Sequence, residues 1–151
     1  MKELGLSVVP GWIERILVNP ECGVAGTCDR AVMRKGWKLP RIADVKTGKS
    51  VHFSELEHSI QQAMYANATH YWDAERGELV PCPPLDKKSA LIIHLPAGKA
   101  TCEVHELDIE AGYEAAMLAV EVKEWRGRRG LSRPFVPEDA APTRAARKGK
   151  A

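Results

Sequence analysis

The chain has 151 residues, a length that fits one domain with a single core and excludes separate catalytic and substrate domains. Hydrophobic residues make up 44% and charged residues 28% of the sequence, and no apolar run reaches the roughly 18 residues of a membrane span. The first eleven residues lack the apolar segment of a signal peptide. We therefore expect a cytoplasmic protein without membrane contact.

The net charge of +2 conceals an uneven distribution of charge. From Arg126 to Ala151 eight basic residues face two acidic ones, which gives this segment a charge of +6 and leaves the rest at −4. Few large apolar residues accompany these charges, so a domain over residues 1–126 and a flexible basic tail over residues 127–151 are predicted. Such a tail is either a solvated end or an arm that approaches DNA phosphates.

The four cysteines show no pattern of a bound metal. Cys22, Cys28, Cys82 and Cys102 form no Cys-x-x-Cys pair and match neither zinc-finger nor iron–sulfur spacing. We expect free thiols.

The first half of the chain predicts a three-stranded meander. Strands are expected over Trp12–Asn19, Val24–Met33 and Leu39–Lys46, with a Pro- and Gly-containing turn between the first two. In the third strand a period of two places Ile42, Asp44 and Lys46 on one side.

The second half predicts two helices and a hairpin. A capping-box spacing and the apolar positions Leu56, Ile60, Met64 and Tyr71 favour a helix over Ser54–Trp72. A Pro-rich loop over Gly77–Lys88, strands over Ala90–Leu95 and Thr101–Leu107, and a helix from Asp108 to Trp125 complete the chain. Together these elements predict an α/β fold whose small mixed sheet, a meander plus a further hairpin, is flanked by helices.

Asp29, Asp44 and Lys46 are the residues that suggest chemistry. Asp44 and Lys46 point to one face of their strand, the Val45 carbonyl lies between them, and antiparallel pairing can set Asp29 opposite Asp44. Carboxylate and carbonyl oxygens bind hard divalent cations, which activate water for phosphodiester hydrolysis. The Lys46 ammonium can stabilise the developing charge or orient the water.

The order of these residues resembles a known family. Gly26-x-x-Asp29, then Asp44-Val45-Lys46, then Gln61-x-x-x-Tyr65 on a helix is similar to the PD-(D/E)XK nuclease superfamily, in particular its RecB-like exonucleases, often encoded by phages. The resemblance implies a restriction-endonuclease-like core and a DNA substrate in recombination, repair or phage replication. It also implies that Asp29 and Asp44 bind Mg²⁺ or Mn²⁺, that Lys46 is catalytic, and that Gln61 and Tyr65 support the site or contact DNA.

Two further expectations concern the N-terminal end. Glu14 stands near the start of the first predicted strand, where many RecB-like sequences have a glutamate, and is a further candidate for the site. The family adds a group from a preceding helix, and Lys2–Leu6 looks like the tail of such a helix. A sheet without that helix would expose an apolar patch that self-associates or recruits a protein partner.

Other interpretations remain open. Thr47-Gly48-Lys49-Ser50 resembles the end of a nucleotide-binding P-loop, but Ala43 stands where its first glycine belongs, and Asp44 would repel phosphate. A nuclease fold retained only for DNA binding or as a structural protein also fits the sequence. His94, in an apolar strand, is interpreted as a satisfied core histidine.

Overall fold

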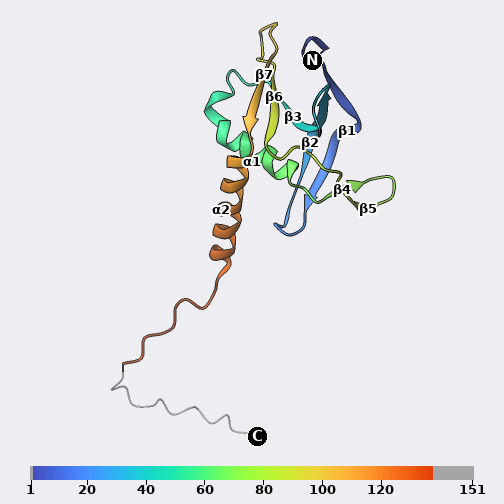
Figure 1. Cartoon of the computed structure of the whole chain (residues 1–151). Helices are drawn as coiled ribbons and strands as arrows, with labels where there is room; N and C mark the ends of the chain where they lie inside the picture. The colour runs from blue at the N-terminus through green and yellow to red at the C-terminus, as the bar shows by residue number, and fades with distance from the viewer. Residues whose placement is uncertain (1, 138–151) are drawn as a thin grey trace.

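The computed structural model describes residues 2–137 and contains one seven-stranded sheet with two α-helices (Figure 1). The strands are β1 Leu6–Asn19, β2 Val24–Arg34, β3 Arg41–Lys46, β4 His70–Asp73, β5 Glu78–Pro81, β6 Ser89–His94 and β7 Glu103–Asp108. The α-helices are α1 Glu55–Ala66 and α2 Glu110–Gly127, and two 3₁₀ turns, η1 Lys2–Leu4 and η2 His52–Ser54, precede β1 and α1.

The strand order is β5-β4-β1-β2-β3-β6-β7. Every neighbouring pair is antiparallel except β3 and β6, which run parallel. A parallel pair needs a long crossover, and here the crossover contains η2, α1 and the β4–β5 hairpin. The predicted α/β class, with a mixed sheet built from a meander and a further hairpin, is confirmed.

The two helices differ in their relation to the sheet. Helix α1 packs on the sheet, whereas α2 packs on α1 and then extends away from the strands (Figure 1). At the crossing the Ser59 hydroxyl donates a hydrogen bond to the Asp108 carbonyl, and a Cβ on Gly112 would collide with Ser59. Asp108 Oδ1 accepts hydrogen bonds from the backbone N–H groups of Glu110 (2.9 Å) and Ala111 (3.4 Å), as its predicted capping role requires.

The core has two parts, one on each face of the sheet. The part on the α1 side contains Trp12, Leu17, Cys28, Ala31, Ile42, Ala63, Ala66, Leu85, Ala90 and Ile109. The part on the other face contains Leu6, Val32, Ala43, Leu91 and Ile93, with Trp37 packed against it. Ile42 and Ala43 therefore face opposite sides, which confirms the predicted alternation along β3.

The predicted helix over Ser54–Trp72 was too long. Helix α1 ends at Ala66, where the Asn67 N–H and side-chain amide both donate to the Ala63 carbonyl, at 3.0 and 2.9 Å. The following aromatic residues pair with β1 as β4, and the expected loop after Gly77 contains β5. Tertiary pairing has overridden the helical period, because β-branched and aromatic residues suit a sheet equally well.

The predicted apolar stripe of α1 was also wrong. Leu56 is 57% exposed and Ile60 and Met64 are half-buried, whereas the buried residues are Ser59, Gln62, Ala63 and Ala66. Ser59, Ala63 and Ala66 are small, which allows α1 to lie close to both the sheet and α2.

Other boundaries differ at the strand starts. Strand β1 begins at Leu6, not Trp12, and the expected helix tail before it is the single turn η1. Strand β3 begins after Pro40, which has no N–H to donate to a ladder. The residues from 128 to 137 form no helix or strand, and the rest of the predicted tail lies outside the described residues.

An exposed apolar row lies on the face of β1, β4 and β5 that points away from α1. The register pairs Leu17 with Tyr71, so Ile16 lies beside Trp72, which in turn pairs with Leu79. Their exposed fractions are 41%, 39% and 45%. Three large apolar side chains therefore form an exposed row on this face.

Candidate active site

The end of β3 carries Asp44 and Lys46 on the face covered by α1. Asp44 is buried, with 4% of its surface exposed. Lys46 Nζ lies 2.6 Å from Asp44 Oδ2, and its side chain is 27% exposed. The pair thus places a buried carboxylate directly beneath a cation that reaches solvent.

Asp29 reaches the same strand from β2. Its Oδ2 accepts a hydrogen bond of 2.8 Å from the Val45 N–H. The ladder between β2 and β3 ends at the pairing of Arg30 with Ala43, so the Asp29 carboxylate replaces a backbone partner beyond that point. It is held next to the peptide group that follows Asp44.

The Val45 carbonyl points to the β2 side of β3. The Lys46 carbonyl accepts a hydrogen bond from the Leu95 N–H next to β6, and successive carbonyls of a strand point to opposite sides. The Val45 carbonyl thus shares a side with Asp29, as its predicted role as an oxygen ligand requires.

Helix α1 adds Gln61 and Tyr65. Gln61 Oε1 accepts a hydrogen bond of 3.4 Å from Lys46 Nζ, and Gln61 Nε2 donates one of 3.3 Å to the Tyr65 hydroxyl. A Cβ on Gly26 would lie 2.9 Å from the Tyr65 ring, so glycine allows the ring to lie against β2. We call Asp29, Asp44, Lys46, Gln61 and Tyr65 the β3 centre.

The electrostatics connect Tyr65 to both carboxylates. Burial raises the pKa of the Tyr65 hydroxyl, and the negative charges of Asp44 and Asp29 raise it further, against the hydrogen bond from Gln61, which lowers it. The hydroxyl therefore stays protonated at neutral pH and remains a hydrogen-bond donor beside the β3 centre.

His58 belongs to this neighbourhood, although the sequence analysis did not single it out. Burial lowers its pKa below 6.5 and Lys46 lowers it further, while Asp44 and Glu57 oppose the shift. The ring is therefore mainly neutral at pH 7. Its position three residues before Gln61 was the available signal, because residues three apart share a helix face.

The β3 centre fits a hard divalent cation. Asp44 Oδ2 is buried and forms an ion pair with Lys46 Nζ at 2.6 Å, in a geometry that does not count as a hydrogen bond. A buried carboxylate is costly to hold charged and gains from a further cation that binds it. Asp29 supplies a second carboxylate and Val45 a carbonyl, and these are the oxygen donors that Mg²⁺ and Mn²⁺ prefer.

The structure does not bring Glu14 into the β3 centre. Glu14 is exposed and lines a separate hollow of about 380 Å³ with Arg15, Tyr71 and Asp73. Its φ of 51° lies in the left-handed region, next to the irregular part of β1 where the register with β2 shifts.

The fold does not support the P-loop interpretation. Residues 47–50 form bends after β3, and the helical residues begin only at η2, so Lys49 and Ser50 do not lie in the first turn of a helix as phosphate binding requires. His94 is buried as expected, and its Nε2 lies 2.8 Å from the Gly48 carbonyl. Its Nδ1, however, has no hydrogen-bond partner, so it is not the satisfied core histidine that was predicted.

All four cysteines are free, as expected. Burial raises the pKa of the Cys28 thiol to about 11. That thiol is inert at neutral pH.

Comparison of the sequence with protein-family models and with curated proteins finds no match. Neither described α-helix is long and apolar enough to cross a membrane.

Proposed function

We propose that this protein is a divalent-metal-dependent DNA nuclease that hydrolyses phosphodiester bonds, with exonuclease action as the expected mode. The observation that supports this most is the buried Asp44 carboxylate at the end of β3, with Asp29, Lys46 and Gln61 around it. The donor set matches the metal chemistry of phosphodiester hydrolysis.

Asp29, Asp44 and the Val45 carbonyl would hold Mg²⁺ or Mn²⁺. When bound, such a cation polarises the phosphate and lowers the pKa of attached water. In the protein alone, the Asp29 carboxylate is fixed by the Val45 N–H, so its geometry is set before a substrate arrives.

Lys46 is the residue that contacts the reacting phosphate or the attacking water in this proposal. Its ammonium is held between Asp44 and Gln61, at 2.6 and 3.4 Å. A fixed positive charge at that point stabilises the negative charge that develops on the phosphate oxygens. Gln61 and Tyr65 act through Lys46 and are positioning residues.

The DNA substrate is supported by charge. The segment that follows α2 carries Arg128, Arg129 and Arg133 in exposed positions, and further basic residues follow in the sequence. Basic side chains bind the phosphate backbone without reading sequence. We further propose that the protein acts in the cytoplasm, in recombination, repair or phage replication.

Metal dependence is the test of this function. The purified chain should degrade linear DNA in Mg²⁺ or Mn²⁺, lose all cleavage in excess chelator, and regain it when the metal is restored. Asp29→Asn protein, purified in the same way, controls for contaminating nucleases, and Glu78→Gln on β5 controls for loss of an exposed carboxylate. DNA binding without cleavage would identify a binding protein, and cleavage in excess chelator would exclude the proposed chemistry.

A further inference from the structure

A second group of ligand-type side chains lies on β6 and β7, one strand away from Lys46. His94 and Glu103 are cross-strand partners, and His105 follows two residues later on the same face of β7. Their ligand atoms, His94 Nδ1, Glu103 Oε2 and His105 Nε2, all lie within 4.8 Å of one another. We call these three residues the imidazole cluster.

The hydrogen bonding of His94 fixes its tautomer. A carbonyl only accepts hydrogen bonds, so His94 Nε2, 2.8 Å from the Gly48 carbonyl, carries the proton. In the neutral ring Nδ1 then presents a lone pair. Metal-binding histidines are commonly oriented in this way, by donation from the other ring nitrogen to a carbonyl.

The lone pair of His94 is buried and faces another electron donor. The His94 side chain is only 7% exposed, its Nδ1 has no hydrogen-bond partner, and Glu103 Oε2 lies 3.9 Å away. His105 Nε2, also buried and without a hydrogen bond, lies 3.4 Å from the same carboxylate oxygen. The His94 lone pair, the Glu103 carboxylate and a ring nitrogen of His105 thus converge without a hydrogen bond between them, an arrangement that a cation at their centre would stabilise.

The donor atoms indicate the class of cation. Two imidazole nitrogens and one carboxylate oxygen suit Zn²⁺ and similar transition metals, whereas Mg²⁺ prefers oxygen ligands alone. Metal–ligand bonds of about 2.0 to 2.1 Å place tetrahedral ligands roughly 3.3 Å apart. The present N–O distances of 3.4 and 3.9 Å are near that value. The Glu103 side chain is 61% exposed and can move to shorten the longer distance, to His94.

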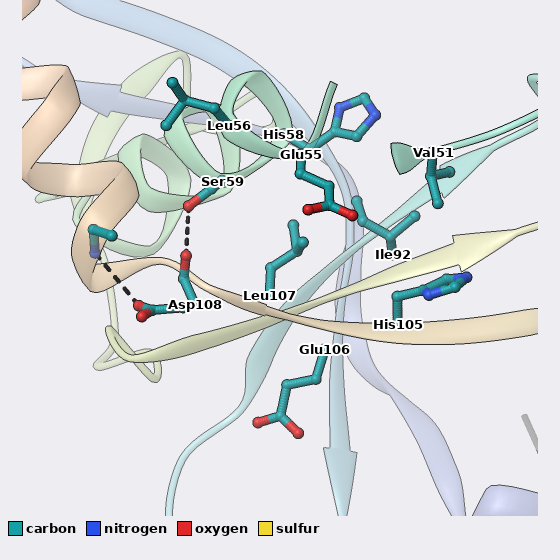
Figure 2. A pocket seen from close by; sticks show the side chains of 11 residues that line it. Val51, Glu55, Leu56, His58, Ser59, Ile92, His105, Glu106, Leu107 and Asp108 are labelled. Carbon is teal, nitrogen blue, oxygen red and sulfur yellow. Dashed lines mark hydrogen bonds between the residues drawn. The ribbon is translucent and has the colours of Figure 1, made fainter. Parts of the chain in front are cut away.

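The cluster is open to solvent on two sides. A pocket of about 250 Å³ is lined by His94 and Glu103, and another of about 360 Å³, between α1 and β7, is lined by His105 and His58 (Figure 2). The two buried nitrogens become accessible to an ion when the exposed Glu103 side chain moves, and a fourth coordination position can then face solvent.

We propose that the imidazole cluster is a binding site for Zn²⁺ or a similar transition metal, separate from the β3 centre. The bound ion joins the ends of β6 and β7 and closes the turn over residues 95–102. It stabilises this edge of the sheet, because an ion that binds only the folded chain shifts the unfolding equilibrium.

The test is metal binding by the full chain, with no need for nuclease activity. Metal-free protein is titrated with Co²⁺, whose visible absorption reports four-coordinate nitrogen and oxygen ligands, and Zn²⁺ is then added to displace it. We expect one Co²⁺ band, its loss with Zn²⁺, and a higher melting temperature in Zn²⁺. Glu103→Gln and His105→Ala should each weaken the affinity by roughly tenfold or more.

Glu106→Gln is the matched control. Glu106 lies on the same strand with the same exposed fraction of 61%, but its side chain points away from His105 (Figure 2). This variant, and Asp44→Asn in the β3 centre, should retain the Co²⁺ band. The proposal is overturned if the wild-type chain shows no band, if Glu103→Gln and His105→Ala bind as tightly as wild type, or if Asp44→Asn abolishes the signal.

Discussion

The β3 centre and the imidazole cluster lie side by side on one face of the sheet, since Lys46 of β3 pairs in register with His94 of β6. Their donor atoms nevertheless differ. The β3 centre offers carboxylate and carbonyl oxygens beside the Lys46 ammonium, whereas the imidazole cluster offers two ring nitrogens and one carboxylate oxygen, and Lys49 and Lys99 line the pocket next to it. Adjacent strands of one sheet therefore present donor sets that suit different classes of cation.

Removing Lys46 should have the largest effect, because it should abolish most cleavage while the β3 centre still binds Mn²⁺. In Lys46→Met we expect cleavage to fall by roughly 10²- to 10³-fold, because a charge aimed at the transition state is lost. Mn²⁺ affinity should be unchanged or tighter, because the ammonium 2.6 Å from Asp44 competes with the ion. Single-turnover cleavage and Mn²⁺ titration by electron paramagnetic resonance measure both effects. Unchanged cleavage would remove Lys46 from the mechanism.

The positioning residues should have smaller effects. Gln61→Ala should slow cleavage by about 10- to 100-fold, since Lys46 loses its 3.4 Å partner. Gln61→Glu keeps an acceptor for the ammonium and should restore much of the rate. Gln61→Ala should bind Mn²⁺ like wild type, and the added carboxylate of Gln61→Glu should leave Mn²⁺ binding unchanged or tighter. Loss of Mn²⁺ binding in Gln61→Ala would show that Gln61 is a structural residue instead.

The basic tail should affect DNA affinity but not the chemistry of either site. A chain ended after Gly127 loses seven basic and two acidic residues, a net charge of +5. DNA binding should weaken, and the slope of log affinity against log salt should decrease by up to about 4.5, at about 0.9 per charge. Filter binding across a salt series measures the slope. An unchanged slope would identify the tail as merely solvated.

His58 should produce a modest pH effect. Its pKa is lowered below 6.5, chiefly by burial and then by Lys46, so the ring gains a proton only as the pH falls below that value. The new charge beside Lys46 and Asp44 should weaken Mn²⁺ binding by about twofold. The decrease between about pH 7 and pH 5 should be smaller in His58→Gln. An identical decrease in both proteins would assign it to groups other than His58.

Glu14 should have the smallest effect. Because this residue faces a separate hollow, Glu14→Gln should cleave DNA within about twofold of wild type. A loss of cleavage rate as large as that expected for Gln61→Ala would show that Glu14 belongs to the β3 centre.

The proximity of the residues of the β3 centre could be predicted from the sequence because most of their spacing is local. A period of two places Asp44 and Lys46 on one face of β3, and a spacing of four places Gln61 and Tyr65 on one face of α1. The position of Asp29 close to Asp44 depended only on the pairing of the neighbouring strands β2 and β3. The hydrogen bond from the Val45 N–H to Asp29 could be found only in the structure, because backbone pairing between β2 and β3 ends at Arg30 and Ala43 and the carboxylate bonds beyond it.

The remaining features depend on tertiary pairing. Residues 70–73 have a composition that suits a helix or a strand, and pairing with β1 decides between them. The imidazole cluster forms because β6 and β7 pair in a particular register, which brings residues 94 and 103 together. No local period predicts that contact, and an isolated histidine in an apolar strand is more often a core residue.

The assignment of the β3 centre as the active site is tested most directly by comparing Mg²⁺-dependent DNA cleavage by Asp44→Asn and Glu103→Gln, measured side by side with wild type. The two variants remove one carboxylate from each of two neighbouring sites. We predict that Asp44→Asn loses more than about 100-fold in rate, beyond the usual effect of a residue that only orients a ligand, while Glu103→Gln stays within about twofold. Wild-type cleavage by Asp44→Asn, or an equal loss in Glu103→Gln, would contradict the assignment of the β3 centre as the active site.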